Sequence, residues 1–193
     1  MKKILYTTFL VSAVAIASVK AEPLQPAVIG IVEQATLDKS AAFKSIIDQL
    51  EKKRNEVQKE MTSYETELKA QDKKLAEEQK TLSDKDFAPK KQAFEKRVRD
   101  IHEKIEVRKA QMELALEDAK TKVYEAFLKV AEDVRKDAGA SIIQYKETIV
   151  TADPSLDLTS KVLEKLNQAL PTVQVTFKSE EEVRKQLQQQ PQQ

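Results

Sequence analysis

Apolar residues recur at heptad spacing on both sides of a single interruption, and this repeat restricts the possible folds more than any other feature. It runs from Phe43 to Leu82 and resumes at Phe94. Steps of four and three residues place these side chains on one face of a helix, which then requires a partner helix. The 193 residues include only two glycines and no tryptophan, with 40% hydrophobic and 34% charged residues. Such a composition is typical of long amphipathic helices rather than of a large globular core.

We call the residues at this heptad spacing the predicted seam, and the interruption divides it into two halves. The first half consists of Phe43, Ile47, Leu50, Arg54, Val57, Met61, Tyr64, Leu68, Gln71, Leu75, Glu78 and Leu82. The second half consists of Phe94, Val98, Ile101, Ile105, Arg108, Met112, Leu116, Ala119, Val123, Phe127, Val130 and Val134. Successive four-residue steps in the second half form a stutter, which relaxes a supercoil toward a straight helix pair.

The interruption, TLSDKDFAPKK (residues 81–91), could be a domain linker, a kink in one rod or the tip of a hairpin. A linker should separate two different patterns, and a kinked rod would leave its seam without a partner. A hairpin gives each seam the other one. Ser83 or Asp86 can cap the returning helix, and Pro89 is tolerated in or near its first turn. The sequence therefore predicts an antiparallel coiled-coil hairpin over residues 38–138, with its tip near 82–90.

Short β-branched segments flank the predicted hairpin. Residues 27–32 form a continuous apolar run, and residues 141–146 and 147–152 are two further strand candidates. Gly139 should end the second long helix, and a short amphipathic helix should begin near Thr159. Three short strands leave exposed sheet edges, so we expect oligomerisation to complete a small β body of residues 27–36 and 140–173. The residues expected in its core or oligomer contact are Val28, Ile29, Ile31, Val32, Ile142, Ile143, Ile149 and Val150.

The two termini differ from the rest of the chain. Residues 1–21 combine a basic start, an uncharged apolar run and a small-x-small end, which predicts a secretory signal peptide cleaved after Ala21. Residues 22–26 form a short leader. Residues 174–193 are expected to be a partly disordered tail, in which Ser179 and Glu182 could form a helix-capping box. The absence of cysteine is compatible with an oxidising compartment.

The charge pattern argues against a general nucleic-acid binder, which would be clearly basic. Removing the three lysines of the signal peptide lowers the basic count from 33 to 30, against 32 acidic residues. Basic residues nevertheless gather near the predicted tip, where they could contact acidic clients or anionic lipid. The predicted tip contacts are Lys73, Lys74, Lys80, Lys85, Phe87, Lys90, Lys91, Lys96 and Arg97.

No pattern in the sequence indicates catalysis, a cofactor or a metal site. His102 is the only histidine and lies on a charged helix, where a solvated role is expected. The sequence contains no phosphate-binding glycine loop and no nucleophile or zinc motif. We therefore predict a protein that is not an enzyme.

The order of segments resembles the Skp/OmpH family of periplasmic chaperones. The resemblance covers roughly residues 27–173. It rests on the signal peptide, the AVIGIVEQA segment (27–35), the charged helical hairpin and a returning β segment that ends in DLTSKVLEKLN (157–167). Known members are markedly basic, whereas this chain is close to neutral after signal removal, and no lipopolysaccharide site can be transferred to it residue by residue.

The resemblance implies a homotrimer with a shared β-barrel body and three helical tentacles around a cavity. Family members hold unfolded outer-membrane proteins there without ATP. The resemblance thus implies an ATP-independent periplasmic holdase, with unfolded outer-membrane proteins and its own copies as partners. The alternative is a structural envelope protein whose hairpin serves as a spacer or docking arm.

Overall fold

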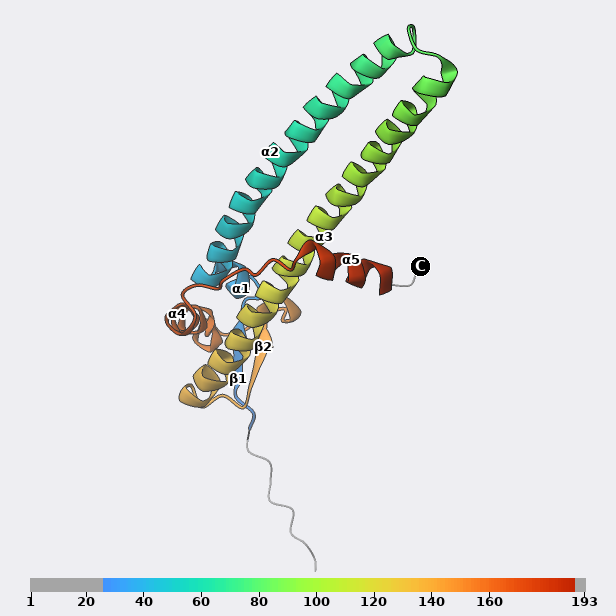
Figure 1. The fold of residues 1–193 in the computed structure, drawn as a ribbon. Helices are drawn as coiled ribbons and strands as arrows, with labels where there is room; N and C mark the ends of the chain where they lie inside the picture. Colours follow the sequence, from blue (N-terminus) through green and yellow to red (C-terminus); the bar gives the residue numbers. More distant parts are fainter. Residues whose placement is uncertain (1–25, 190–193) are drawn as a thin grey trace, which may run out of the picture.

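The computed structural model describes residues 26–189, so the predicted signal peptide and most of the leader lie outside the described residues. Two long helices rise side by side from a small base that contains both strands (Figure 1). The elements are β1 (Ile29–Val32), α1 (Thr36–Lys39), α2 (Ala41–Glu78), α3 (Asp84–Asp137), β2 (Ile142–Tyr145), the 3₁₀ turns η1 (Lys146–Thr148) and η2 (Pro154–Leu156), α4 (Thr159–Ala169) and α5 (Glu180–Gln189). The predicted mainly helical fold with a small sheet is confirmed.

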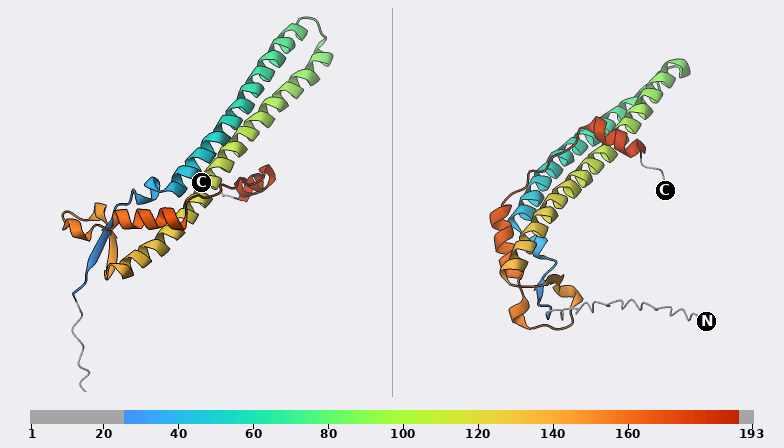
Figure 2. Two further views of the ribbon diagram at one scale, coloured as in Figure 1. Left: turned by 90° about the vertical axis from the view of Figure 1, so that its left-hand side faces the viewer. Right: turned by 90° about the horizontal axis from the view of Figure 1, so that it is seen from below.

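Helices α2 and α3 run in opposite directions along each other (Figure 2). Ion pairs join Glu60 to Arg108, Glu67 to Arg97 and Glu78 to Lys90, so the partner number falls in α3 as it rises in α2. At 1.5 Å per residue, the 38 residues of α2 extend for about 57 Å and the 54 residues of α3 for about 81 Å. We call residues 47–105 of this helix pair the arm.

Capping side chains determine where these helices begin and end. The Ser40 hydroxyl accepts a hydrogen bond from the Phe43 amide at the start of α2, and Ser83 accepts one from the Asp86 amide at the start of α3. Gly139 ends α3 with a φ of 64°. The bonds from its amide to Lys136 and from the Ala140 amide to Arg135 satisfy the last carbonyls of the helix. Pro89 lies in the second turn of α3, slightly deeper than predicted.

The sheet has two strands rather than the three predicted. β1 and β2 pair in parallel, with Ile29 opposite Ile142 and Val32 opposite Tyr145. The predicted strand at residues 147–152 is wrong. The chain turns there because the Thr148 hydroxyl donates to the Tyr145 carbonyl at 2.7 Å, and the Ile149 amide donates to the Lys146 carbonyl at 3.0 Å. On the other side of β1, Ile31 instead forms a bridge with Asp157.

Two apolar clusters form the core around the base. The first lies between the sheet, α3 and α4 and contains Val32, Phe127, Val130, Ala131, Val134, Leu158, Val162 and Leu166. The second lies between α2, α3 and the C-terminal segment and contains Ala42, Ile46, Ala115, Ala119, Val123, Val173 and Val175. The structure thus differs from the prediction of a separate tail after residue 173, because packing continues through Val175 into α5. The predicted capping box of that helix is present, since the Glu182 amide donates to Ser179 and the Ser179 amide donates to Glu182.

Most apolar positions of the predicted seam are buried or half-buried, including Ala119, Val123, Phe127, Val130 and Val134 around the base, but two positions are wrong. Ile47 and Ile105 are 44% and 37% exposed, whereas Ile46 and Val107 are buried. Near the base, α2 and α3 contact additional elements as well as each other. At Ile47 and Ile105 the buried position is therefore shifted by one or two residues from the one that a two-helix seam predicts.

The contact between Gly30 and Leu158 provides a test of the base. A Cβ at Gly30 would lie 2.5 Å from Leu158 Cδ1, so we expect Gly30→Ala to lower the free energy of unfolding by about 1–3 kcal/mol. In a Leu158→Ala background the same change should cost less than about 1 kcal/mol, because the clash is removed. Urea unfolding of the four proteins measures both costs.

Gly139→Ala serves as the matched control. No atom lies within 4 Å of a Cβ there, and only the positive φ causes strain. Its cost should therefore be the same in the wild-type and Leu158→Ala backgrounds. An equal cost of Gly30→Ala in both backgrounds would contradict the close packing of Leu158 on Gly30.

Candidate functional site

The base exposes several of the apolar residues predicted for an oligomer contact. Val28, Ile29 and Ile142 are 45%, 36% and 47% exposed, and Val150 is fully exposed. The other predicted residues belong to the chain's own interior, because Ile31 and Val32 are buried and Ile143 and Ile149 are half-buried. The predicted set therefore divides into a core within one chain and an exposed apolar group around a two-stranded sheet.

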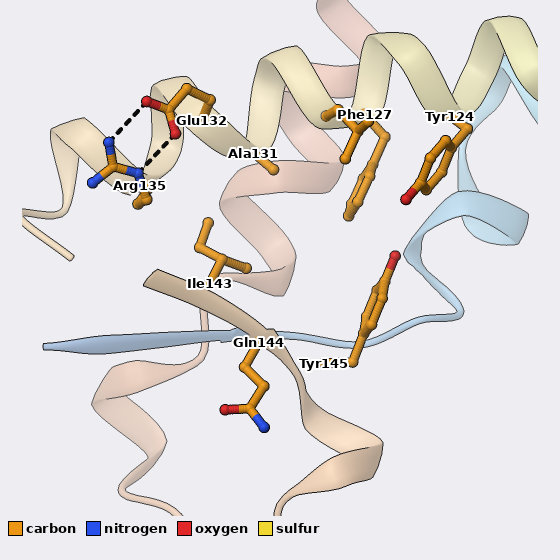
Figure 3. Close-up of a pocket in the computed structure, with 9 residues that line it drawn as sticks. Tyr124, Phe127, Ala131, Glu132, Arg135, Ile143, Gln144 and Tyr145 are labelled. Atoms are coloured by element: carbon orange, nitrogen blue, oxygen red, sulfur yellow. Dashed lines mark hydrogen bonds and ion pairs between the residues drawn. The ribbon is translucent and has the colours of Figure 1, made fainter. Parts of the chain in front are cut away.

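A groove of about 290 Å³ lies between α3 and β2 (Figure 3). Its apolar wall is formed by Tyr124, Phe127, Leu128, Ile143 and Tyr145. The rings of Phe127 and Tyr145 stack with their centroids 6.4 Å apart, and burial raises the pKa of the Tyr145 hydroxyl. Two wall residues remain exposed, Tyr124 at 45% and Leu128 at 49%. The groove thus adds a second apolar surface beside the exposed strand residues.

An ion pair lies at one end of this groove. Arg135 donates to both oxygens of Glu132 at 2.7 and 2.8 Å, and it also donates to the Ala140 carbonyl. These hydrogen bonds, with a further contribution from Lys136, lower the pKa of Glu132 to about 2. A charged pair therefore limits the apolar surface at this end, as at the rim of a protein contact.

The Asp157–Thr159 segment connects the start of α4 to the strands of the base by hydrogen bonds. Asp157 Oδ1 accepts from the Thr159 amide at 2.9 Å, and Asp157 Oδ2 accepts from Lys146 Nζ at 2.9 Å. The Thr159 hydroxyl accepts from the Glu33 amide at 3.0 Å, and the Leu158 amide donates to the Ile31 carbonyl at 2.8 Å. The hydrogen bonds to Asp157 lower its pKa to about 2. The segment is therefore structural and does not form an exposed binding site.

The arm contains almost no dry core. None of residues 47–100 is fully buried, although apolar side chains such as Val57, Met61 and Leu68 are half-buried at the expected spacing. A hollow of about 470 Å³ lies between the helices near the tip, beside Leu75 and Phe94. Much of the contact between the helices is polar here. We infer that the arm can separate or reshape at less cost than the base, because few buried apolar contacts hold it closed.

Ion pairs reduce the free charge of the predicted tip. Arg97 binds Glu67, Lys90 binds Glu78 and Lys96 binds Asp100, each at 2.7 Å. Lys91 approaches Glu95 at 3.9 Å, and Phe87 is half-buried. The remaining predicted tip residues Lys73, Lys74, Lys80 and Lys85 are exposed. The structure therefore divides the predicted basic group into lysines that face solvent and cations that form ion pairs, two of which join the two helices.

The part of the chain that the structure describes contains no cluster of three or more potential metal ligands. His102 is exposed on α3. Among residues 26–189, no helix is both long and apolar enough to cross a bilayer. The features available for binding are therefore the base surface, the arm and the tip.

Sequence reasoning missed two surfaces. Tyr124 and Leu128 lie four residues apart beside the predicted seam, and this second apolar row on α3 could have indicated the groove. The C-terminal segment was also missed, although its Val173, Val175 and Phe177 alternate with polar residues and indicate an extended, half-buried segment.

Exposed apolar surface at the base and a half-open seam along the arm are typical of proteins that bind other polypeptides. The sequence model of the family described as "Outer membrane protein (OmpH-like)" matches residues 29–166. The chain therefore belongs to the OmpH-like family, a family of non-enzymatic chaperones, and this membership supports a chaperone role.

One solved structure with a similar fold is that of a candidate outer membrane chaperone (OmpH-like) from Caulobacter crescentus CB15. The TM-score is 0.74 and the sequence identity 19%, over 82% of this chain and 94% of the other. At this identity the likeness concerns the fold. No curated protein matches the chain.

The lowered pKa of Asp157 gives a prediction about pH. We expect Asp157→Asn to lower the free energy of unfolding by about 1 kcal/mol at pH 7, since it removes the charge that attracts Lys146 and the site is partly exposed. The folded-state pKa lies below the ordinary value of 3.8, so this stabilisation is complete above about pH 4 and is lost as pH falls toward 2.

Urea unfolding of both proteins between pH 2 and pH 7 measures the difference. Asp118→Asn on the exposed face of α3 is the control, and it should change stability by less than about 0.5 kcal/mol throughout. A difference between wild type and Asp157→Asn that stays constant down to pH 2 would disprove the role of the Asp157 charge.

Proposed function

We propose that this protein is an ATP-independent periplasmic holdase that binds unfolded outer-membrane proteins between the arms of a homotrimer. The observation that carries this proposal is the arm itself. A long helix pair in which residues 47–100 include no fully buried side chain keeps its apolar stripe half-accessible. Membership of the OmpH-like family supports the same role.

The architecture provides a physical route to holding without nucleotide. Half-exposed side chains such as Val57, Met61 and Leu68 offer many weak apolar contacts rather than one deep site. An unfolded chain can exchange among such contacts, and the rigid base keeps the arm in place while it does so. In this proposal the exposed tip lysines meet acidic segments of the client or anionic lipid first.

The homotrimer is supported by the incomplete base. Isolated two-stranded sheets are marginal, and parallel strands are normally covered on both faces. Here Val28, Ile142 and Val150 are exposed beside the Tyr124–Tyr145 groove. Strands and apolar side chains from other copies would cover these surfaces and close the sheet.

Aggregation of an unfolded outer-membrane β-barrel protein, diluted from denaturant, tests the chaperone activity. We expect the signal-free protein, at about one trimer per client chain, to suppress light scattering without ATP, because the cavity of one trimer holds one client chain. A coiled-coil protein of equal length without apolar seam exposure is the control. If the protein leaves aggregation unchanged, the holdase proposal fails and the role of a spacer or docking arm becomes the better account.

The double substitution Ile142→Asp and Val150→Asp tests the assembly. Charges on exposed apolar positions should block burial between copies, so the mass measured by light scattering should fall from that of a trimer to that of a monomer. Thr151→Asp changes an exposed polar neighbour and should leave the trimer intact. A wild-type monomer, or a trimer that tolerates both aspartates, would refute the shared base.

A further inference from the structure

The C-terminal segment crosses the helix pair as an extended chain where the arm meets the base. We call residues 171–179 the strap; it leads from α4 to α5 across α2 and α3 (Figure 1, Figure 2). Its side chains alternate. Val173 and Val175 are 4% and 7% exposed and Phe177 is half-buried, whereas Gln174 and Thr176 face solvent. The strap thus has the period of a β-strand but lies on helices, with no neighbouring strand among the described residues.

Two glutamine side chains bind the backbone of the strap. Gln49 Nε2 donates to the Val173 carbonyl at 2.7 Å, while Gln49 Oε1 accepts from the Val175 amide at 3.1 Å. Gln111 Nε2 donates to the Lys178 carbonyl at 2.7 Å. Every polypeptide offers these carbonyl and amide groups, so this recognition depends on extended backbone geometry and not on side-chain identity.

The surface beneath the strap is apolar and made partly of small side chains. Val173 and Val175 pack with Ala42, Ile46, Ala115 and Ala119. Three of these four residues are alanines, whose short side chains let an extended chain approach the helices closely. We call this surface, together with Gln49 and Gln111, the strap site.

The element that follows the strap is held by few contacts. α5 has ten residues, and a helix of this length is marginal on its own. It buries Val183 and forms ion pairs from Glu180 to Arg108, at 2.9 Å, and from Arg184 to Glu103. The exposed parts of such ion pairs contribute little. Release of α5 therefore costs little, and release of the strap would open the second apolar cluster but leave the first, between the sheet, α3 and α4, intact.

We propose that the strap site is a binding site for an extended polypeptide with apolar residues at alternate positions, and that the chain's own strap fills it in the absence of a client. Transmembrane strands of outer-membrane β-barrels alternate apolar and polar residues with this period. An unfolded client segment with this alternation can therefore replace Val173, Val175 and Phe177, while Gln49 binds its backbone. This inference rests on the proposed function and specifies how a client segment is recognised.

Peptide binding to the full chain tests the strap site. The probe is a fluorescent peptide with the sequence of residues 171–179. In the variant Val173→Asp/Val175→Asp the strap is destabilised, and we expect it to bind the probe about tenfold or more tightly than wild type does. Thr176→Asp, which changes an exposed strap residue, should bind like wild type. Adding Gln49→Ala to the double variant should weaken binding by about tenfold.

The order of residues along the peptide distinguishes binding at this site from nonspecific hydrophobic binding. A second peptide of the same composition, with its three apolar residues adjacent, should bind the double variant about tenfold more weakly or not at all. Equal binding of both peptides, or no binding of the first peptide to a double variant whose helical circular dichroism is intact, would overturn the proposal.

A second measurement applies if the double variant does not fold. Wild-type protein is mixed with excess probe that carries a photoreactive phenylalanine at the position of Phe177. Crosslinks should map to α2 near Lys53, whose ammonium lies 5.7 Å from the Phe177 ring, and excess unlabelled peptide of residues 171–179 should reduce them more than the peptide with adjacent apolar residues does. Crosslinks only at other places, or crosslinks that both unlabelled peptides reduce equally, would refute the strap site.

The two proposals can fail separately. If wild type suppresses aggregation but the probe does not bind the folded Val173→Asp/Val175→Asp variant, the strap site is refuted and the holdase role stands. If the probe binds with the expected order dependence but aggregation is unaffected, the site exists and the holdase role is refuted.

Discussion

The contact of Leu158 with Gly30 joins the two ends of the domain, and the placement of the long helices depends on it. Leu158 fills the space that a side chain on β1 would occupy, and its amide bonds to Ile31. Thr159 and Asp157 then fasten the same point through Glu33 and Lys146. Since β1 and the Asp157–Thr159 segment are more than 100 residues apart in sequence, the base can close only after both long helices have brought the chain back.

The burial of apolar side chains decreases from the base of the molecule to the tip of the arm. Around the base, buried side chains such as Phe127 and Leu166 form a dry core that fixes the arm's direction. In the arm, half-buried apolar residues alternate with pairs such as Glu67–Arg97, which keep the helices together without excluding water. Apolar side chains that stay half-buried in the folded arm remain accessible for contact with other apolar groups. The dry core thus lies around the base, whereas the arm keeps its apolar side chains partly accessible.

The sequence predicts the elements whose signals are local. Ser83 and Gly139 act within one turn of α3 and lie where its two ends were predicted, and α4 begins at Thr159 as expected. Sequence predictions fail where contacts between segments far apart in the chain determine the structure. Residues 147–152 have a strand composition but no strand to pair with in the described part of this chain, and Ile47 gives way to Ile46 because the strap and the helix pair share that face. Half of the predicted base residues are exposed, because apolar residue type alone does not decide which side chains the chain's own fold buries.

Because the strap occupies its own site, a client segment has to compete with the strap in order to bind. If the strap competes for its site, the apparent affinity of any single segment falls in proportion to the fraction of time the site is open. A short apolar stretch then gains little, whereas an unfolded β-barrel protein offers many alternating strands to several sites at once and gains from multivalency. Release is favoured for the same reason, because the strap rebinds as soon as a client strand folds elsewhere. Selectivity for long unfolded chains and release without nucleotide would both follow from the hydrogen bonds of Gln49 to an extended backbone.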